Sequence, residues 1–317
     1  MNFKFTRNFI TISTIILYFF SCAGKELRMT VQGASYCLSS KIHINTIVPT
    51  MEVASMQMND LEMRNKFSPK SLRLAIAYGI FEDLKKFSKL NLNAKSSAES
   101  LRLEDKIFRT IQLMILDIDS TTSEYECYVD RFTEILTMMN EKEDDIVRNN
   151  TLYAIMAGAM AAIADGATSL SDSDKNANQA IILVGGLLVA YFSYKAFKPN
   201  ITIEFKPKST NLKEIWFNSP KSENYSTSLW FLLTKDLLKN ELPIRDLLVK
   251  RWLENNFLGT EEERDFHINL FFGTGGVSTI THISNRKEMN NEVRSLVNLL
   301  KQDVKGLQIE FLNLKQE

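Results

Sequence analysis

Two histidines near the end of the 317-residue chain are the residues best placed for metal chemistry. His267 and His282 flank the glycine-rich turn segment Thr274-Gly275, around which we expect strands at 266–272 and 277–283 to form a hairpin. A two-residue turn would place the two imidazoles directly opposite each other, and a three-residue turn would separate them. Two imidazoles without a third ligand are too few for a zinc site. The sequence therefore predicts no metal site.

Oxygen-bearing side chains also occupy alternate positions in one polar segment, namely Asp172, Asp174, Asn176 and Asn178. Oxygen ligands have this spacing in the first half of an EF-hand calcium loop. However, Ala177 stands where that loop needs glycine, and Leu183 stands where it needs a bidentate glutamate. We interpret the segment as a polar loop that caps a helix.

No other arrangement of side chains indicates catalysis or a bound cofactor. No Ser/His/Asp, Cys/His or paired-carboxylate pattern rises above chance. The glycine-rich segment 273–276 precedes an expected strand and not a helix N-terminus that could hold a phosphate. The sequence therefore predicts no catalytic residue and no cofactor, and an enzyme is the least favoured function class.

The overall charge excludes one class of partner. The chain has 38 Lys and Arg residues against 38 Asp and Glu residues, so it lacks the basic excess of a nucleic-acid-binding protein. With 44% hydrophobic and 24% charged residues, it has the composition of a folded protein. Its length allows about two domains.

The N-terminus has the pattern of a secretory signal, which we assign to residues 1–21. Lys4 and Arg7 precede the apolar run Phe9–Phe20, which is short for a membrane span. The run ends at Ser21-Cys22-Ala23-Gly24, and these residues resemble the lipobox of bacterial lipoproteins. Phe19 occupies the position three residues before the cysteine, where a lipobox usually has leucine. The remainder of the chain carries no such resemblance.

The lipoprotein resemblance implies cleavage before Cys22 and acylation of this cysteine, which would anchor the chain stably in a membrane. An ordinary cleaved signal or an uncleaved anchor is the alternative. Cys37 and Cys127 would then be the remaining thiols. They could pair in an oxidising envelope compartment, although two cysteines do not make a disulfide framework.

Residues 22–66 show little periodicity and predict a tether, and residues 67–150 predict a helical domain. Ser68-Pro69 is a helix start. Apolar residues then alternate in steps of three and four over 101–146, which predicts a coiled-coil-like seam on a helix of about 69 Å. This seam must pack on another chain, in a homo-oligomer or with a protein partner, or on a folded-back segment. Ser120–Ser123 could instead divide it into two helices.

Residues 151–198 predict a hydrophobic helical hairpin. Leu152–Ala164 is wholly apolar, Ala180–Tyr194 contains only Ser193 as a polar residue, and a polar connection joins the two runs. Each run is shorter than the about 20 residues that span a bilayer. Small residues recur at four-residue spacing, which allows close helix packing in lipid: Ala154, Gly158, Ala162 and Gly166 on the first arm, and Gly186 and Ala190 on the second. A membrane-inserting hairpin is the favoured interpretation, and a hairpin buried in a soluble core is the alternative.

Residues 199–317 predict an α+β domain. We expect strands at 201–206, 266–272, 277–283 and 307–314 and helices at 226–240, 243–257 and 285–306. This order is the split βαβ of a ferredoxin-like antiparallel sandwich. The predicted fold class is therefore α+β and mainly helical, a bundle with a hydrophobic hairpin followed by a small sandwich.

These patterns together predict a membrane-anchored protein of the bacterial cell envelope that acts by binding or assembly, with membrane lipid as a partner. A lipidated Cys22 favours the outer membrane or cell surface, and a spanning hairpin favours the inner membrane. A membrane-permeabilising protein is the alternative, since the predicted architecture resembles helical pore-forming toxins, in which a long bundle presents a hydrophobic hairpin. In this chain, Lys198-Pro199 ends the second arm and we expect no long returning helix after it.

Overall fold

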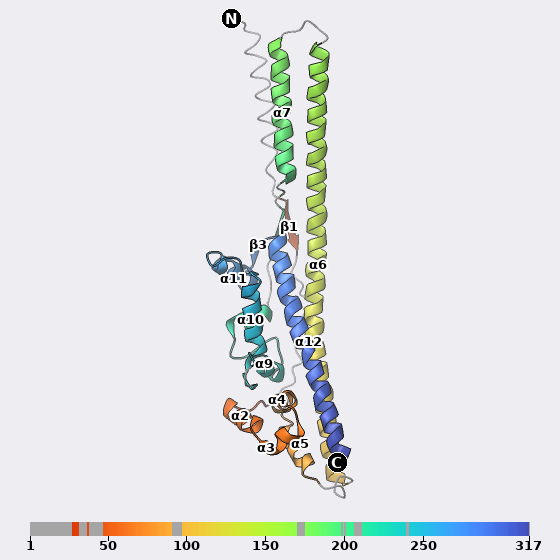
Figure 1. The fold of residues 1–317 in the computed structure, drawn as a ribbon, viewed down its shortest axis with the longest axis vertical. Coiled ribbons are helices and arrows are strands. Elements are labelled where there is room, and N and C mark those ends of the chain that lie inside the picture. The colour runs from red at the N-terminus through yellow and green to blue at the C-terminus, as the bar shows by residue number, and fades with distance from the viewer. Residues whose placement is uncertain are drawn as a thin grey trace. The chain divides into compact units, whose positions relative to one another are not determined.

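The computed structural model describes residues 27–31, 37, 47–90, 97–169, 175–197, 199, 201–205, 211–238 and 241–316 (Figure 1). These residues are mainly helical, as predicted, with one small sheet. The chain divides into two compact units. The elements in chain order are β1 (Leu27–Val31), α2 (Met51–Met58), α3 (Leu61–Lys66), α4 (Pro69–Ala77), α5 (Phe81–Ser88), α6 (Ala98–Ser169), α7 (Lys175–Phe197), β2 (Ile201–Phe205), α8 (Asn211–Phe217), α9 (Thr227–Thr234), α10 (Ile244–Glu254), α11 (Arg264–Phe272), β3 (Gly276–Thr279) and α12 (Ile280–Gln316).

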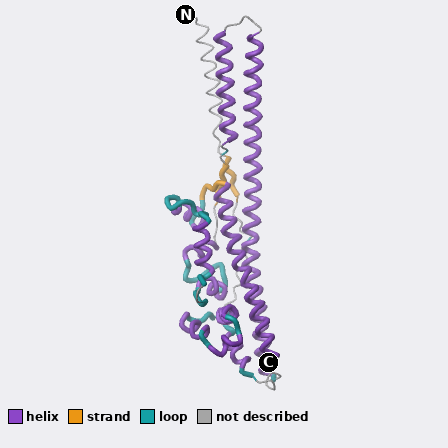
Figure 2. The backbone as a smooth tube through the Cα atoms, viewed as in Figure 1, coloured by secondary structure: helices purple, strands orange, loops and turns teal. Residues whose placement is uncertain are grey.

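Unit 1 contains β1, α6 from Leu136 onward, α7, and most of β2 and β3. Its sheet has the strand order β1-β2-β3, and Figure 2 shows these strands in orange. The prediction of a strand at 201–206 is confirmed by β2. Thr202 is buried together with Ile201 and Ile203, so the central strand is covered more completely than the simple alternation of its sequence predicted.

Unit 2 contains the main apolar core, built from α2–α5, the first part of α6, α8–α11 and most of α12. Local signals place several of these helices. The Ser68 hydroxyl accepts a hydrogen bond from the Ser71 amide at 3.3 Å, as expected for the predicted cap of α4. The Ser226 hydroxyl caps α9 in the same way through the Leu229 amide.

The predicted long seam lies on one continuous helix, α6. Ser120–Ser123 does not divide it, because the Thr122 hydroxyl donates to the Ile118 carbonyl at 3.0 Å and so has a partner within the helix. Up to Ile135, the seam is covered by α12 of the same chain. Ion pairs join Glu104 to Lys315 at 2.5 Å and Glu126 to Arg294 at 3.7 Å, so the two helices run antiparallel. Of the two predicted covers for the seam, another chain or a folded-back segment of the same chain, the structure contains the folded-back segment, α12, over this part of α6.

The predicted final strand at 307–314 is wrong, and so is the helix end at Gly306. Both lie inside α12, where Leu307, Phe311 and Leu314 are buried in steps of four and three. These residues continue the helical spacing of the segment before them. A Cβ atom on Gly306 would lie 3.9 Å from the Ser71 hydroxyl oxygen, an ordinary contact, so this glycine is an interior residue of α12 and not a cap.

The predicted strand at 266–272 is also wrong, since these residues belong to α11. A short apolar run fits either a strand or a buried helix. Here His267, Leu270 and Phe271 are buried, and their spacing is helical. The second predicted strand of that hairpin, 277–283, is a strand only as far as Thr279. The described residues therefore do not form the four-stranded sheet of a ferredoxin-like sandwich.

The stretch predicted as a tether, 22–66, is partly folded. It contains β1, α2 and α3, and Ala54 and Met63 are fully buried. Thr50 and Asp60 cap the two helices by accepting hydrogen bonds from the Val53 and Met63 amides. These N-cap residues were visible in the sequence, but the helices are too short to show a periodic pattern.

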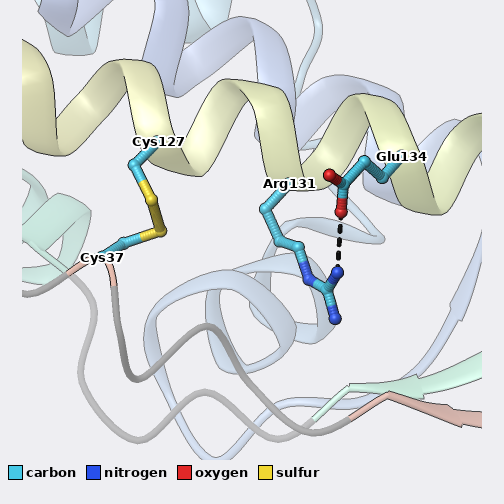
Figure 3. Close-up of a disulfide and its surroundings, with 4 residues drawn as sticks. All are labelled: Cys37, Cys127, Arg131 and Glu134. Atoms are coloured by element: carbon cyan, nitrogen blue, oxygen red, sulfur yellow. Dashed lines mark hydrogen bonds and ion pairs between the residues drawn. A yellow bond between two sulfur atoms is a disulfide. The ribbon is translucent and has the colours of Figure 1, made fainter.

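A disulfide joins Cys37 to Cys127 on α6 within unit 2 (Figure 3). The two Cα atoms are 5.6 Å apart, and 90 residues of sequence separate the cysteines. Arg131 and Glu134, one turn and two turns further along α6, form an ion pair at 2.7 Å. The pairing that the sequence left open is thus present in the structure.

Candidate functional site

The apolar hairpin is the most unusual feature of the described residues. Its first arm is the end of α6, residues 151–169, and its second arm is α7, residues 175–197. Both arms belong to unit 1, where they lie side by side (Figure 1). The sequence contains no charged residue between Arg148 and Asp165 on the first arm, and no charged residue between Lys175 and Lys195 on the second arm.

Small residues bring the two arms into contact along one narrow face. Ala154, Ala157 and Gly185 are buried there. A Cβ atom built on Gly185 would lie only 2.4 Å from the Cβ atom of Ala161, so the helices meet most closely at this point. Because small side chains allow this approach, the arms pack by backbone proximity, as helices do in lipid.

The six residues predicted to pack the hairpin divide into two groups. Ala154 is buried, and Gly158 is half-buried with its Cβ position 3.6 Å from a methyl group of Val189. The other four are exposed on the outer surface: Ala162, Gly166, Gly186 and Ala190. Gly185, which makes the closest contact, lies next to predicted Gly186. One residue rotates a helix face by about 100°, so the doublet Gly185-Gly186 could not show which glycine faces inward.

Large apolar side chains cover the outer surface of both arms. The exposed fraction is 71% for Ile163, 64% for Leu183 and 89% for Phe197. The exposed large apolar residues of the two arms are Leu152, Tyr153, Ile155, Met156, Met160, Ile163, Ile182, Leu183, Leu187, Tyr194 and Phe197. They occur all around the hairpin outside its narrow contact face. Soluble monomers normally expose single, scattered apolar side chains, whereas this apolar surface is continuous along both arms.

No helix in the part of the chain that the structure describes is both long and apolar enough to cross a membrane.

The chain matches no family model, and it matches no curated protein and no solved structure. Its function must therefore be inferred from its own residues.

The sequence analysis also considered candidate residues other than the six small residues of the hairpin. Cys22, Asp172 and Asp174 lie outside the described residues, and Asn176 and Asn178 lie in the first turn of α7. His267 and His282 do come together, with 3.2 Å between their Nε2 atoms. They meet from two helices, α11 and α12, and not across a β-hairpin as predicted.

Arg286 is one of several charged residues that are buried, and no pattern in the sequence predicted its burial. Arg286 on α12 is only 5% exposed, and its guanidinium lies over the Phe205 ring, 4.7 Å from the centroid. It donates to the Leu270 carbonyl at 3.4 Å. Burial lowers the pKa of Arg286 to about 10, although nearby Tyr128 opposes this change. Nothing in the sequence around Arg286 indicates this burial, because Arg286 stands among other polar residues.

Proposed function

We propose that the chain is a membrane-anchored protein of the bacterial cell envelope, that its apolar hairpin packs at or inserts into a lipid membrane, and that it acts by binding or assembly. The single observation that supports this most is the uncharged, apolar outer surface of the hairpin. Water is a poor solvent for such a surface, so another phase or another molecule must cover it.

Lipid is the cover that fits the distribution of these side chains. Exposed apolar residues follow both arms and point in several directions, for example Tyr153, Ile155 and Met156 within about one turn of one arm. A helix that is apolar all round is typical of a membrane or the interior of a large protein. A protein partner that covered one face would leave the other faces in water. The proposal requires contact with the bilayer and does not require either arm to cross it.

Two further features support export of the chain to the envelope. The Cys37–Cys127 disulfide is of the kind that persists in oxidising compartments such as the bacterial periplasm. The segment around Cys22 has the lipobox-like pattern described above, and acylation of this cysteine would supply the anchor.

Vesicle flotation tests the hairpin separately from the lipid anchor. The full chain with Cys22→Ala, which cannot be acylated at that position, is mixed with vesicles of phosphatidylethanolamine and phosphatidylglycerol and centrifuged through a density gradient. We expect it to float with the vesicles. The double variant Ile163→Glu/Leu183→Glu should stay at the bottom, because two carboxylates would have to enter lipid at a cost of about 3 kcal/mol each near the bilayer centre.

Leu116→Glu is the matched control. Leu116 is 61% exposed on α6 but lies in unit 2, far along the sequence from the hairpin, so this variant should float like the parent. Equal flotation of all three chains would contradict the proposal. Vesicles loaded with a self-quenching dye distinguish the alternative function, because dye release by the parent chain would favour a membrane-permeabilising protein.

A further inference from the structure

The histidine pair of unit 2 is independent of the hairpin and has its own chemistry. His267 on α11 is 7% exposed, and His282 on the first turn of α12 is half-buried. Their Nε2 atoms are 3.2 Å apart, and their ring centroids are 5.0 Å apart. Two imidazole nitrogens from different helices therefore converge on one point.

The protonation of His267 follows from its hydrogen bonds. Its Nδ1 atom lies 3.0 Å from the backbone carbonyl of Glu263, and a carbonyl can only accept. Nδ1 therefore carries the proton, and in the neutral ring Nε2 presents a lone pair. Histidines that bind metals are commonly held in this way, with the second ring nitrogen donating to a carbonyl or carboxylate.

The distances fit a shared metal ion. Nitrogens that are 3.2 Å apart, each at a zinc–nitrogen distance of about 2.05 Å, subtend about 100° at the ion, close to the tetrahedral angle. Lone pairs that converge on such an ion place the two ring centroids about 5 Å apart, whereas rings that meet head-on would be about 5.5 Å apart. The observed separation of 5.0 Å agrees with convergence.

The surroundings of His282 favour its neutral form, which ligation requires. Burial and the charge of neighbouring His267 lower the pKa of His282, while the carboxylate of Glu263 opposes this shift. Phe266 and Phe271 pack beside the two imidazoles. Among the described residues, no group of three His, Cys, Asp or Glu side chains is arranged to hold a metal. The protein thus contributes two ring nitrogens, one fewer than the three protein ligands that usually hold a catalytic zinc ion, and water molecules would fill the other positions.

We propose that His267 and His282 bind one divalent transition-metal ion of the kind that prefers imidazole, such as Zn²⁺ or Cu²⁺. In the metal-free protein, the His282 Nε2 proton bridges to His267. The metal ion takes the place of this proton, which transfers to Nδ1 of the same ring, so that His282 binds as a neutral imidazole. The bound ion joins α11 to α12.

Isothermal titration of the purified full chain with ZnCl₂ tests the site. We expect one equivalent to bind at pH 7.5 without net proton release, because the displaced proton stays on the His282 ring, so the measured heat should not depend on the ionisation enthalpy of the buffer. His282→Gln should abolish this binding event. His43→Gln is the matched control, because His43 is the third histidine of the chain, and this variant should bind zinc like the parent.

A second readout excludes a folding artefact. Cu²⁺ bound to the parent chain should show hyperfine coupling to two imidazole nitrogens by electron paramagnetic resonance, and His282→Gln should lose it while keeping the parent's far-ultraviolet circular dichroism. The proposal is overturned if the parent binds no zinc, or if His43→Gln and His282→Gln bind it equally.

Discussion

Replacing Gly185 with alanine should push apart the two helices of the hairpin, whereas the same change at Gly186 should not. The added Cβ atom at Gly185 would lie 2.4 Å from the Cβ atom of Ala161, about 1.5 Å inside a normal carbon–carbon contact. At Gly186, no atom lies within 4 Å of the added Cβ atom. The two neighbouring glycines therefore form a matched pair.

The expected magnitudes follow from two opposing effects. In either position, alanine favours the helix by about 1 kcal/mol over glycine. At Gly185, overpacking costs about 1–3 kcal/mol, because the Cβ atom of Ala161 is fixed to its backbone and cannot rotate away. We therefore expect Gly186→Ala to stabilise the hairpin slightly, and Gly185→Ala to be less stable than Gly186→Ala by about 1–3 kcal/mol.

Amide hydrogen exchange of α7 measures this difference within the hairpin itself. Exchange in Gly185→Ala should be faster than in Gly186→Ala. Adding Ala161→Gly should slow it again, because this change removes the opposing Cβ atom. Equal exchange in the two single variants would refute the packing face described here. Faster exchange in Gly186→Ala would instead favour the face that the sequence predicted through Gly186 and Ala190.

Three further predictions concern unit 2. Cys37→Ser should lower the free energy of unfolding by about 2–4 kcal/mol, measured in urea, because the disulfide closes a long loop in the unfolded chain; the same loss should follow reduction of the parent, and no loss on reduction would contradict the pairing. Tyr225→Phe should cost about 1–3 kcal/mol, because the buried Tyr125 hydroxyl loses its hydrogen-bond partner; the double variant Tyr125→Phe/Tyr225→Phe should cost less than this, and a larger loss would show that the two hydroxyls are not each other's main partners. Burial lowers the pKa of His282 from 6.5 in the folded protein, so the neutral form of His282 favours folding. This contribution is full above about pH 6.5 and is lost as the pH falls through the lower folded value. His282→Gln should therefore lose less stability than the parent between pH 7.5 and 5.5, and identical pH profiles of the two chains would contradict this prediction.

Local signals in the sequence predicted parts of the fold correctly. Ser68 and Ser226 begin helices because each hydroxyl accepts a bond from an amide three residues later, and this requires no distant contact. Ile201–Phe205 has the composition and alternation of a strand, and it forms one. The regular steps of three and four on α6 predicted a long helix that needed a cover.

Distant contacts decided what the sequence could not show. Gly306 has the character of a helix end, but α12 continues through it, and Leu307, Phe311 and Leu314 beyond it are buried at helical spacing. Phe266–Phe272 suits a strand or a helix in isolation, and burial of His267, Leu270 and Phe271 in the core selects the helix. The cover of the α6 seam also came from α12, whose last segment had been predicted as a strand.

The candidate site was predictable in position but not in orientation. Two uncharged runs in the sequence located the hairpin. The sequence does not show which of the adjacent small residues Gly185 and Gly186 faces the other arm. In the structure it is Gly185, which packs against Ala161. The histidine pair is a different case, since the turn length left open whether the two residues meet, and they meet from two helices and not across the expected hairpin.

A spin label at the hairpin surface tests the central claim most directly. A nitroxide is attached to Leu187→Cys, where the native side chain is 58% exposed, and to Leu116→Cys, where it is 61% exposed. The full chain, also carrying Cys22→Ala, is mixed with vesicles, and collisions of the label with oxygen and with a water-soluble nickel complex are compared. If the hairpin enters lipid, the label at position 187 should meet oxygen more often and nickel less often once vesicles are added, and the label at position 116 should not change. Unchanged nickel accessibility at position 187 would contradict the account.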